Sequence, residues 1–229
     1  MDSLGKTARL AGLFWFLLAA TTGFGLVYVR PKLIVFADAA ATAGNIVAHE
    51  SLFRASIAGS VLGQIFLLLF GVTVFRLFKD ADRSLATFLL ASVLPGVAVG
   101  VVNSLNHLGA LLVLTNPEHL RVFQPEQLNA LAMIFLKLHN FGVGLLEIFT
   151  ALLLFTLGLL IIRTRYLPRA LGVLLIIGAC AFPLNTFTKI LVPQFYPALI
   201  TRLTMLLNAA GSPATILWLL IKGVREPHA

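Results

Sequence analysis

Residues 139–162 read HNFGVGLLEIFTALLLFTLGLLII, and this stretch decides the class of fold. A helix rises about 1.5 Å per residue, so this run measures about 36 Å and can cross a hydrocarbon core about 30 Å thick. Similar apolar runs occupy residues 10–29, 54–75, 84–104, 170–190 and 203–221. The sequence therefore predicts an all-α, polytopic transmembrane helical bundle of about six spans.

The composition agrees with a membrane protein. Hydrophobic residues make up 59% of the 229 residues and charged residues only 11%, whereas a soluble domain carries about 25% charged residues. The loops between the runs are too short for a separate soluble domain, so we expect a single integral membrane domain over residues 1–229. The lone Cys180 excludes an internal disulfide, and no Cys/His spacing resembles a zinc site. We therefore predict no metal and no cofactor.

The basic residues indicate the orientation of the chain. Ten of them lie at the termini and in the loops around residues 76–83 and 163–169, against seven on the opposite side. This bias predicts that both termini are cytoplasmic and that the chain lies in the plasma (inner) membrane, with the lipid bilayer and not nucleic acid as its partner. The first apolar run follows Lys6 and Arg9 but is longer than the core of a signal peptide, so we expect a retained anchor.

The outward-facing connections are the longer ones. Residues 38–51 are rich in Ala and begin with Asp38, a pattern typical of a short helix on the outer surface. Apolar character also continues from Ser84 through Leu114, which as one helix would measure about 46 Å. We therefore expect a kink at Pro95-Gly96, with residues 105–115 either projecting outward or forming a cap with residues 128–138.

Polar side chains at membrane depth are the main indication of function. Because ionisable groups in a bilayer cost at least about 2.5–3.5 kcal/mol each, they usually face the bundle interior or a wet cavity. Most of them lie in the outer half of the predicted spans, which predicts a polar pocket open to the outer face. The candidate ligand-binding residues are Arg54, Asn103, Asn106, His107, His139, Asn140, Glu147, Asn185, Lys189, Arg202 and Asn208.

Three of these residues are also candidates for catalysis. Glu147 lies near mid-membrane on a helical face that it shares with Asn140, too deep for its charge to reach the head groups. His107 and His139 fit three roles: capping a helix end, handling a proton or ligand, or ligating a metal or haem if they face each other. A structural alternative applies to two sets of these residues: hydrogen bonds between helices for Asn103, Asn185 and Asn208, and contact with lipid head groups for Arg54, Lys189 and Arg202.

Small residues predict close helix contacts. Gly59 and Gly63 form a GxxxG step, and Gly142 and Gly144 thin one side of a later span. We expect packing within the chain, with a homodimer as the alternative.

Three segments carry a resemblance to a known family: ARLAGL at residues 8–13, LHNFG at 138–142 and LPRALGVL at 167–174. They resemble a bacterial family of multi-pass membrane proteins known as a domain of unknown function, over nearly the whole chain. The resemblance implies the fold class and no activity. It places His139 and Arg169 in recurrent segments, while Asn140 stands where that family often has Asp.

Three functions fit these residues. The first is binding of an amphiphilic or anionic ligand in the outer pocket, and the lack of an internal repeat disfavours an alternating-access transporter. The second is an enzyme acting on a lipid or isoprenoid, with Glu147 as general acid and His107 or His139 as base. The third is a scaffold or accessory subunit with no ligand. The partners to expect are thus a lipid or small amphiphile, a second copy of the chain, or a partner subunit.

Overall fold

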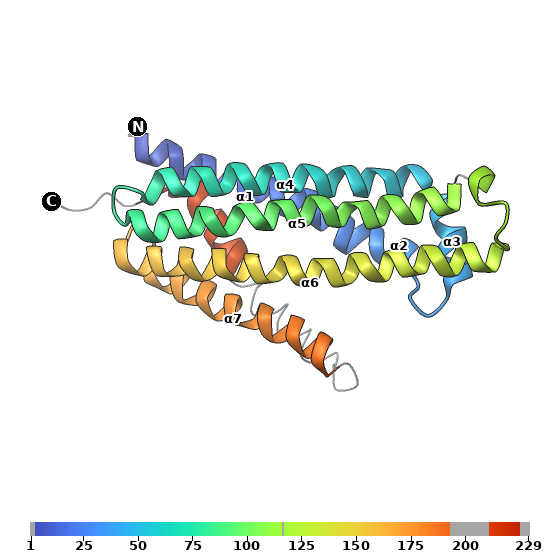
Figure 1. The fold of residues 1–229 in the computed structure, drawn as a ribbon. Helices are drawn as coiled ribbons and strands as arrows, with labels where there is room; N and C mark the ends of the chain where they lie inside the picture. Colours follow the sequence, from blue (N-terminus) through green and yellow to red (C-terminus); the bar gives the residue numbers. More distant parts are fainter. Residues whose placement is uncertain (1–2, 116, 193–210, 225–229) are drawn as a thin grey trace. The chain divides into compact units, whose positions relative to one another are not determined.

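The computed structural model describes residues 3–115, 117–192 and 211–224, and every regular element within them is a helix. The predicted all-α fold is confirmed (Figure 1). In chain order the elements are α1 (Ser3–Gly23), the π-helix η1 (Phe24–Val29), α2 (Arg30–Leu33), α3 (Ala39–Ala48), α4 (Glu50–Phe78), α5 (Arg83–Thr115), the 3₁₀ helix η2 (Pro117–Leu120), α6 (Pro125–Thr164) and α7 (Arg169–Leu191), followed by a helix at Gly211–Ile221.

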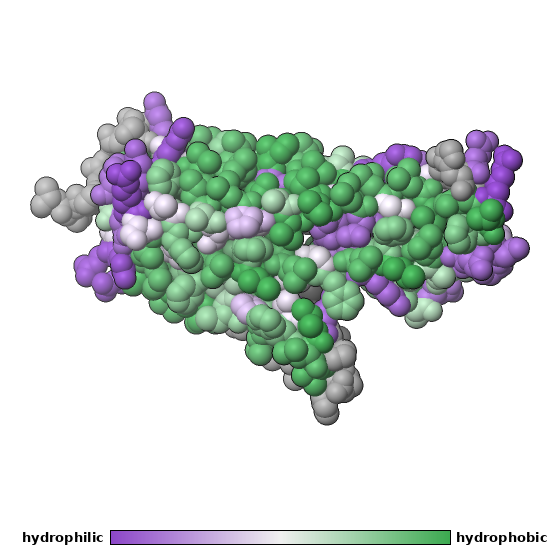
Figure 2. Space-filling model, viewed as in Figure 1, coloured by the Kyte–Doolittle hydropathy of each residue, from purple (hydrophilic) through white to green (hydrophobic). Residues whose placement is uncertain are grey.

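Five stretches of helix are long and apolar enough to cross a membrane. They are Leu4–Leu33, Glu50–Phe78, Arg83–Thr115, Pro125–Thr164 and Arg169–Leu191, and they coincide with five of the six predicted spans. Figure 2 shows hydrophobic residues over most of the visible surface, with hydrophilic residues gathered toward the helix ends and in a few patches. Of the sixth predicted span, residues 203–210 lie outside the described residues and Gly211–Ile221 is helical.

The chain divides into two compact units, which we describe separately. Unit 1 comprises Met1–Leu17, Phe66–Val97 and Gly144–Ala229, and unit 2 comprises Leu18–Ile65 and Ala98–Val143. Helices α1, α4, α5 and α6 each contribute residues to both units.

Unit 2 is built around an apolar core formed by residues of η1, α2, α3, α4, α5 and α6. The buried core residues are Val29, Leu33, Ile46, Phe53, Ile57, Ala110, Leu111, Val113, Ala132 and Leu136. The predicted short helix is present as α3, and the Asp38 side chain caps it by accepting a hydrogen bond from the Ala41 N–H at 2.9 Å. One face of α3, with Thr42 and Ile46, is buried in this core.

Helices α5 and α6 extend well beyond the predicted spans 84–104 and 139–162. α5 is continuous to Thr115 with Pro95 inside it, and α6 already begins at Pro125. The reason is that apolar positions recur past the predicted ends, and Leu111 and Leu136 are buried in the unit 2 core. At about 1.5 Å per residue, α5 measures about 50 Å and α6 about 60 Å, so neither fits within a single hydrocarbon core.

Glycines set the closest helix contacts. In unit 2 a Cβ at Gly59 would lie 3.1 Å from the Thr21 carbonyl oxygen, so the predicted GxxxG step packs within the chain, against α1. In unit 1, Gly158 of α6 and Gly172 of α7 touch backbone to backbone: a Cβ on either would lie 2.6–2.7 Å from the carbonyl oxygen of the other.

Candidate functional site

Two histidines of unit 2 lie face to face. The imidazoles of His107 on α5 and His139 on α6 have centroids 3.4 Å apart and planes inclined by 17°. Phe53 of α4 also packs against His107, at 5.3 Å between ring centroids. The sequence alone makes both histidines candidates but does not show that they meet.

A reciprocal pair of hydrogen bonds ties His139 to Asn103. The Asn103 Nδ2 donates to the His139 carbonyl oxygen at 3.0 Å, and the His139 Nδ1 lies 3.1 Å from the Asn103 carbonyl oxygen. The Asn106 amide donates to Asn103 Oδ1 at 3.0 Å. Gly142 makes room for this arrangement, because a Cβ there would overlap the Asn103 amide. The site thus joins α5 to α6.

Arg30 completes the cluster and was not among the predicted site residues. Its guanidinium donates to Asn140 Oδ1 at 3.1 Å and lies 5.2 Å from the centroid of the Phe36 ring. It is also within electrostatic range of His107 and His139. The π-helical turn Phe24–Val29 directly precedes Arg30, and such turns shift the direction of the side chains that follow. Arg30 could not be assigned to the site from the sequence, where it is only a basic residue at the end of an apolar run.

His107 has an unsatisfied polar atom. Its Nδ1 is buried and has no hydrogen-bond partner among the described residues. Stacked rings 3.4 Å apart also leave no space for a macrocycle between them, so a haem held by both histidines does not fit this arrangement. Among the described residues no group of three or more His, Cys, Asp or Glu could hold a metal ion.

The predicted residues of unit 1 form a separate group around Glu147 of α6. Glu147 Oε2 accepts hydrogen bonds from Asn185 Nδ2 and Thr186 Oγ1 of α7, both at 3.3 Å. The Thr186 hydroxyl also lies 3.0 Å from the Gly144 carbonyl oxygen, and Lys189 is within electrostatic range of the carboxylate. Thr186 was missed, because a threonine in an apolar run commonly bonds only to its own helix.

Of the remaining predicted residues, the structure describes only Arg54. Arg54 forms an ion pair with Glu50 one turn earlier on α4, at 2.6 Å, and its side chain is 56% exposed. Arg202 and Asn208 lie outside the described residues. Because the histidine and Glu147 groups belong to different units, the single polar pocket and the pairing of Glu147 with a histidine base both stay predictions.

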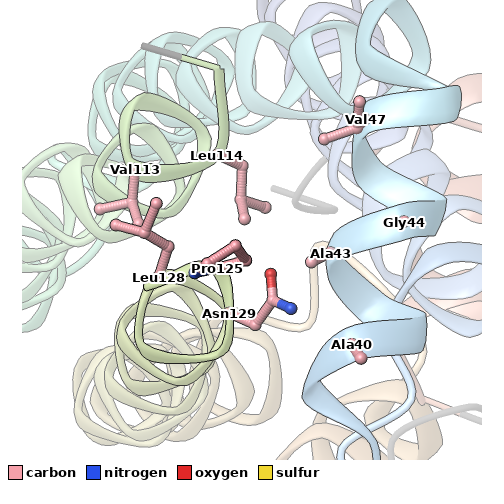
Figure 3. A pocket seen from close by; sticks show the side chains of 9 residues that line it. All are labelled: Ala40, Ala43, Gly44, Val47, Val113, Leu114, Pro125, Leu128 and Asn129. Atoms are coloured by element: carbon pink, nitrogen blue, oxygen red, sulfur yellow. The ribbon is translucent and has the colours of Figure 1, made fainter. Parts of the chain in front are cut away.

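Unit 2 also contains an open cavity of about 420 Å³, shown in Figure 3. It lies where α3 faces the end of α5 and the start of α6, and none of the predicted site residues that the structure describes lines it. The lining residues are Ala40, Ala43, Gly44, Val47, Val113, Leu114, Pro125, Leu128 and Asn129.

Comparison with known proteins places the chain in a family. No curated protein and no solved structure matches it. The family model described as a domain of unknown function (DUF4386) matches residues 10–223, which agrees with the resemblance seen in the sequence. The match covers nearly the whole length, and the long apolar helices are those of a membrane family, so the chain belongs to the DUF4386 family.

Proposed function

We propose that this multi-pass membrane protein binds an amphiphile whose polar head group lies against the His107–His139 pair. The observation that carries the proposal is the His107 Nδ1, which is buried and has no hydrogen-bond partner among the described residues. A buried polar atom left without a partner costs about 1–3 kcal/mol, so a ligand that supplies the missing hydrogen bond gains that amount. A hydroxyl group suits either tautomer of the ring, because it both donates and accepts.

The surroundings of the histidine pair support entry from the lipid. Apolar side chains next to it in the chain are widely exposed, with Val102 at 63%, Leu105 at 61% and Leu138 at 49%. A surface of this kind faces lipid in a membrane protein, so an amphiphile can approach laterally. The Arg30 guanidinium favours a head group that carries negative charge, such as a phosphate.

We also infer that the chain lies in the plasma (inner) membrane with both termini cytoplasmic. The excess of basic residues at the termini and in the loops after the second and fourth predicted spans supports this orientation. Counting along α6 from Arg163, about 20 residues cross the hydrocarbon core. His139 therefore lies near the outer boundary, where an amphiphile's head group resides.

Native mass spectrometry of the full chain released from nanodiscs tests the proposal. The wild type should carry a bound amphiphile, and His107→Phe should lose it, because phenylalanine keeps the ring against Phe53 but has no nitrogen. His49→Phe is the matched control, since His49 is exposed and bonds to the Asn45 carbonyl of its own segment. Equal occupancy in the wild type and in His107→Phe would reject the proposal.

One observation favours the alternative function, that of a scaffold or accessory subunit with no ligand. The Glu147 carboxylate is already held by Asn185 and Thr186, as expected of a polar group that joins α6 to α7. If the scaffold is correct, the same experiment should yield a protein free of bound amphiphile.

A further inference from the structure

We propose that the cavity at α3, α5 and α6 of unit 2 is a second binding site, which takes the single alkyl chain of a fatty acid or similar medium-chain amphiphile. The site is distinct from the histidine pair. Along α5 the buried Ala110 and Leu111 lie between His107 and the cavity residue Val113. The nine lining residues include none of the histidine group, so the two sites use different side chains.

The lining matches a saturated chain. Eight of the nine lining residues are aliphatic or glycine, and none of the nine is aromatic or charged. A volume of about 420 Å³ lies within the range of about 300–1,000 Å³ typical of small-molecule sites. Water gains few hydrogen bonds in such a space, whereas an alkyl chain gains from leaving water.

The cavity exists because α3 packs on the rest of unit 2 through only one of its faces. The Thr42 side chain bonds to both the N–H and the carbonyl oxygen of Val35, at 2.9 and 3.0 Å, and Ile46 is fully buried. These contacts hold one face of α3, while the adjoining face presents Ala40, Ala43 and Gly44 to the cavity. A Cβ at Gly44 would meet no atom of the described residues within 4 Å, so the described part of the chain leaves this space open.

Asn129 provides one polar group at the cavity. Figure 3 shows its amide directed from α6 toward α3. An amide donates to a carboxylate and accepts from a protonated acid or alcohol, so it can hold the polar end of the chain. Starting at Arg163, about 20 residues of α6 cross a hydrocarbon core about 30 Å thick. Asn129 lies about 20 Å beyond the end of that stretch. Bulk lipid tails therefore do not fill the cavity, and a chain must enter it from outside the hydrocarbon core.

Photolabelling with dodecanoic acid that carries a diazirine tests this site on the full chain in phosphatidylcholine nanodiscs. Peptide mass spectrometry should find adducts at residues 40–47 and 125–129. Gly44→Leu places a side chain in the cavity and should reduce this labelling by about tenfold, the equivalent of about 1.4 kcal/mol of binding. Ala41→Leu is the matched control, because Ala41 is exposed on α3 and does not line the cavity.

Two results would overturn the proposal: labelling of residues 40–47 that Gly44→Leu leaves unchanged, or adducts confined to other helix surfaces. His107→Phe distinguishes this site from the proposed function. That variant should keep the labelling of α3 whether or not it loses the amphiphile at the histidine pair.

Discussion

Asn103 and His139 each use the side chain to bond the other's backbone carbonyl, so two hydrogen bonds of 3.0 and 3.1 Å link α5 to α6 from both directions. Such a reciprocal arrangement satisfies four polar groups at once and fixes both the rotation and the register of the two helices. It also sets the orientation of the His139 ring that stacks on His107.

We predict that each of these two hydrogen bonds stabilises the protein. Each one joins a side chain to a backbone carbonyl, so Asn103→Ala removes one bond and His139→Ala removes the other. Each variant should lower the free energy of unfolding by at least about 0.6 kcal/mol, the average for hydrogen bonds between membrane helices. Unfolding in mixed detergent micelles measures the loss. His49→Ala is the control, because His49 is exposed and its ring bonds to the Asn45 carbonyl of its own segment. Asn103→Ala and His139→Ala variants as stable as His49→Ala would contradict the prediction.

Gly142 should tolerate no larger residue while Asn103 is present. A Cβ at Gly142 would overlap the Asn103 amide, so Gly142→Ala should destabilise the protein by about 1–3 kcal/mol. Adding Asn103→Ala should recover most of that loss. Gly144→Ala is the control, since its Cβ would lie 3.5 Å from the Thr186 side chain, an ordinary contact. A Gly142→Ala variant as stable as the wild type would contradict the close packing.

The sequence predicts the helices better than their ends. Apolar runs of about 20 residues identify membrane spans because the bilayer sets their length. The same rule underestimates α5 and α6, since Leu111 and Leu136 lie in apolar stretches that pack within unit 2 beyond the predicted spans.

The sequence does not show which residues of the site contact one another. His107, His139 and Asn103 could be singled out because polar groups at membrane depth are costly. That His107 stacks on His139, and that Arg30 bonds to Asn140, depend on how α5, α6 and the segment around η1 pack. Gly158 and Gly172 lie in different helices with no local motif, so only the tertiary structure brings them together.

We predict that the Gly158–Gly172 contact is more sensitive to substitution than the Gly142 contact. In both directions an added Cβ would meet a carbonyl oxygen at 2.6–2.7 Å, and backbone cannot move aside as a side chain can. Gly158→Ala and Gly172→Ala should each cost at least about 3 kcal/mol. Thermal unfolding in detergent can rank them against Gly23→Ala, where a Cβ would meet nothing within 4 Å. Equal stability of all three variants would rule out this contact.

Asp82 should make the start of α5 sensitive to acid. Its carboxylate accepts from the Leu85 N–H at 3.0 Å and from the Arg163 guanidinium at 3.0 Å. The Leu85 hydrogen bond, and after it Arg163, hold the pKa of Asp82 below its ordinary value of 3.8. The resulting stability is fully present above pH 3.8 and is lost as the pH falls through the lowered pKa.

Comparison with Asp82→Asn isolates this acid sensitivity. Asparagine can still cap the helix but does not titrate, so below pH 3.8 the unfolding midpoint of the wild type should fall more steeply than that of the variant. Parallel curves for the two proteins would mean that the Asp82 carboxylate adds nothing at this helix end.

Cysteine accessibility can decide the orientation inferred from the basic residues. With Cys180→Ser as background, Arg121→Cys places a thiol between α5 and α6, and Lys79→Cys places one between α4 and α5; both positions are exposed. A membrane-impermeant maleimide should label Arg121→Cys in intact cells and Lys79→Cys only after the membrane is opened, because basic loops stay in the cytoplasm. The reverse labelling pattern would mean that both termini lie on the outer side of the membrane. It would also turn the alkyl-chain cavity, which lies beside Pro125, toward the cytoplasm.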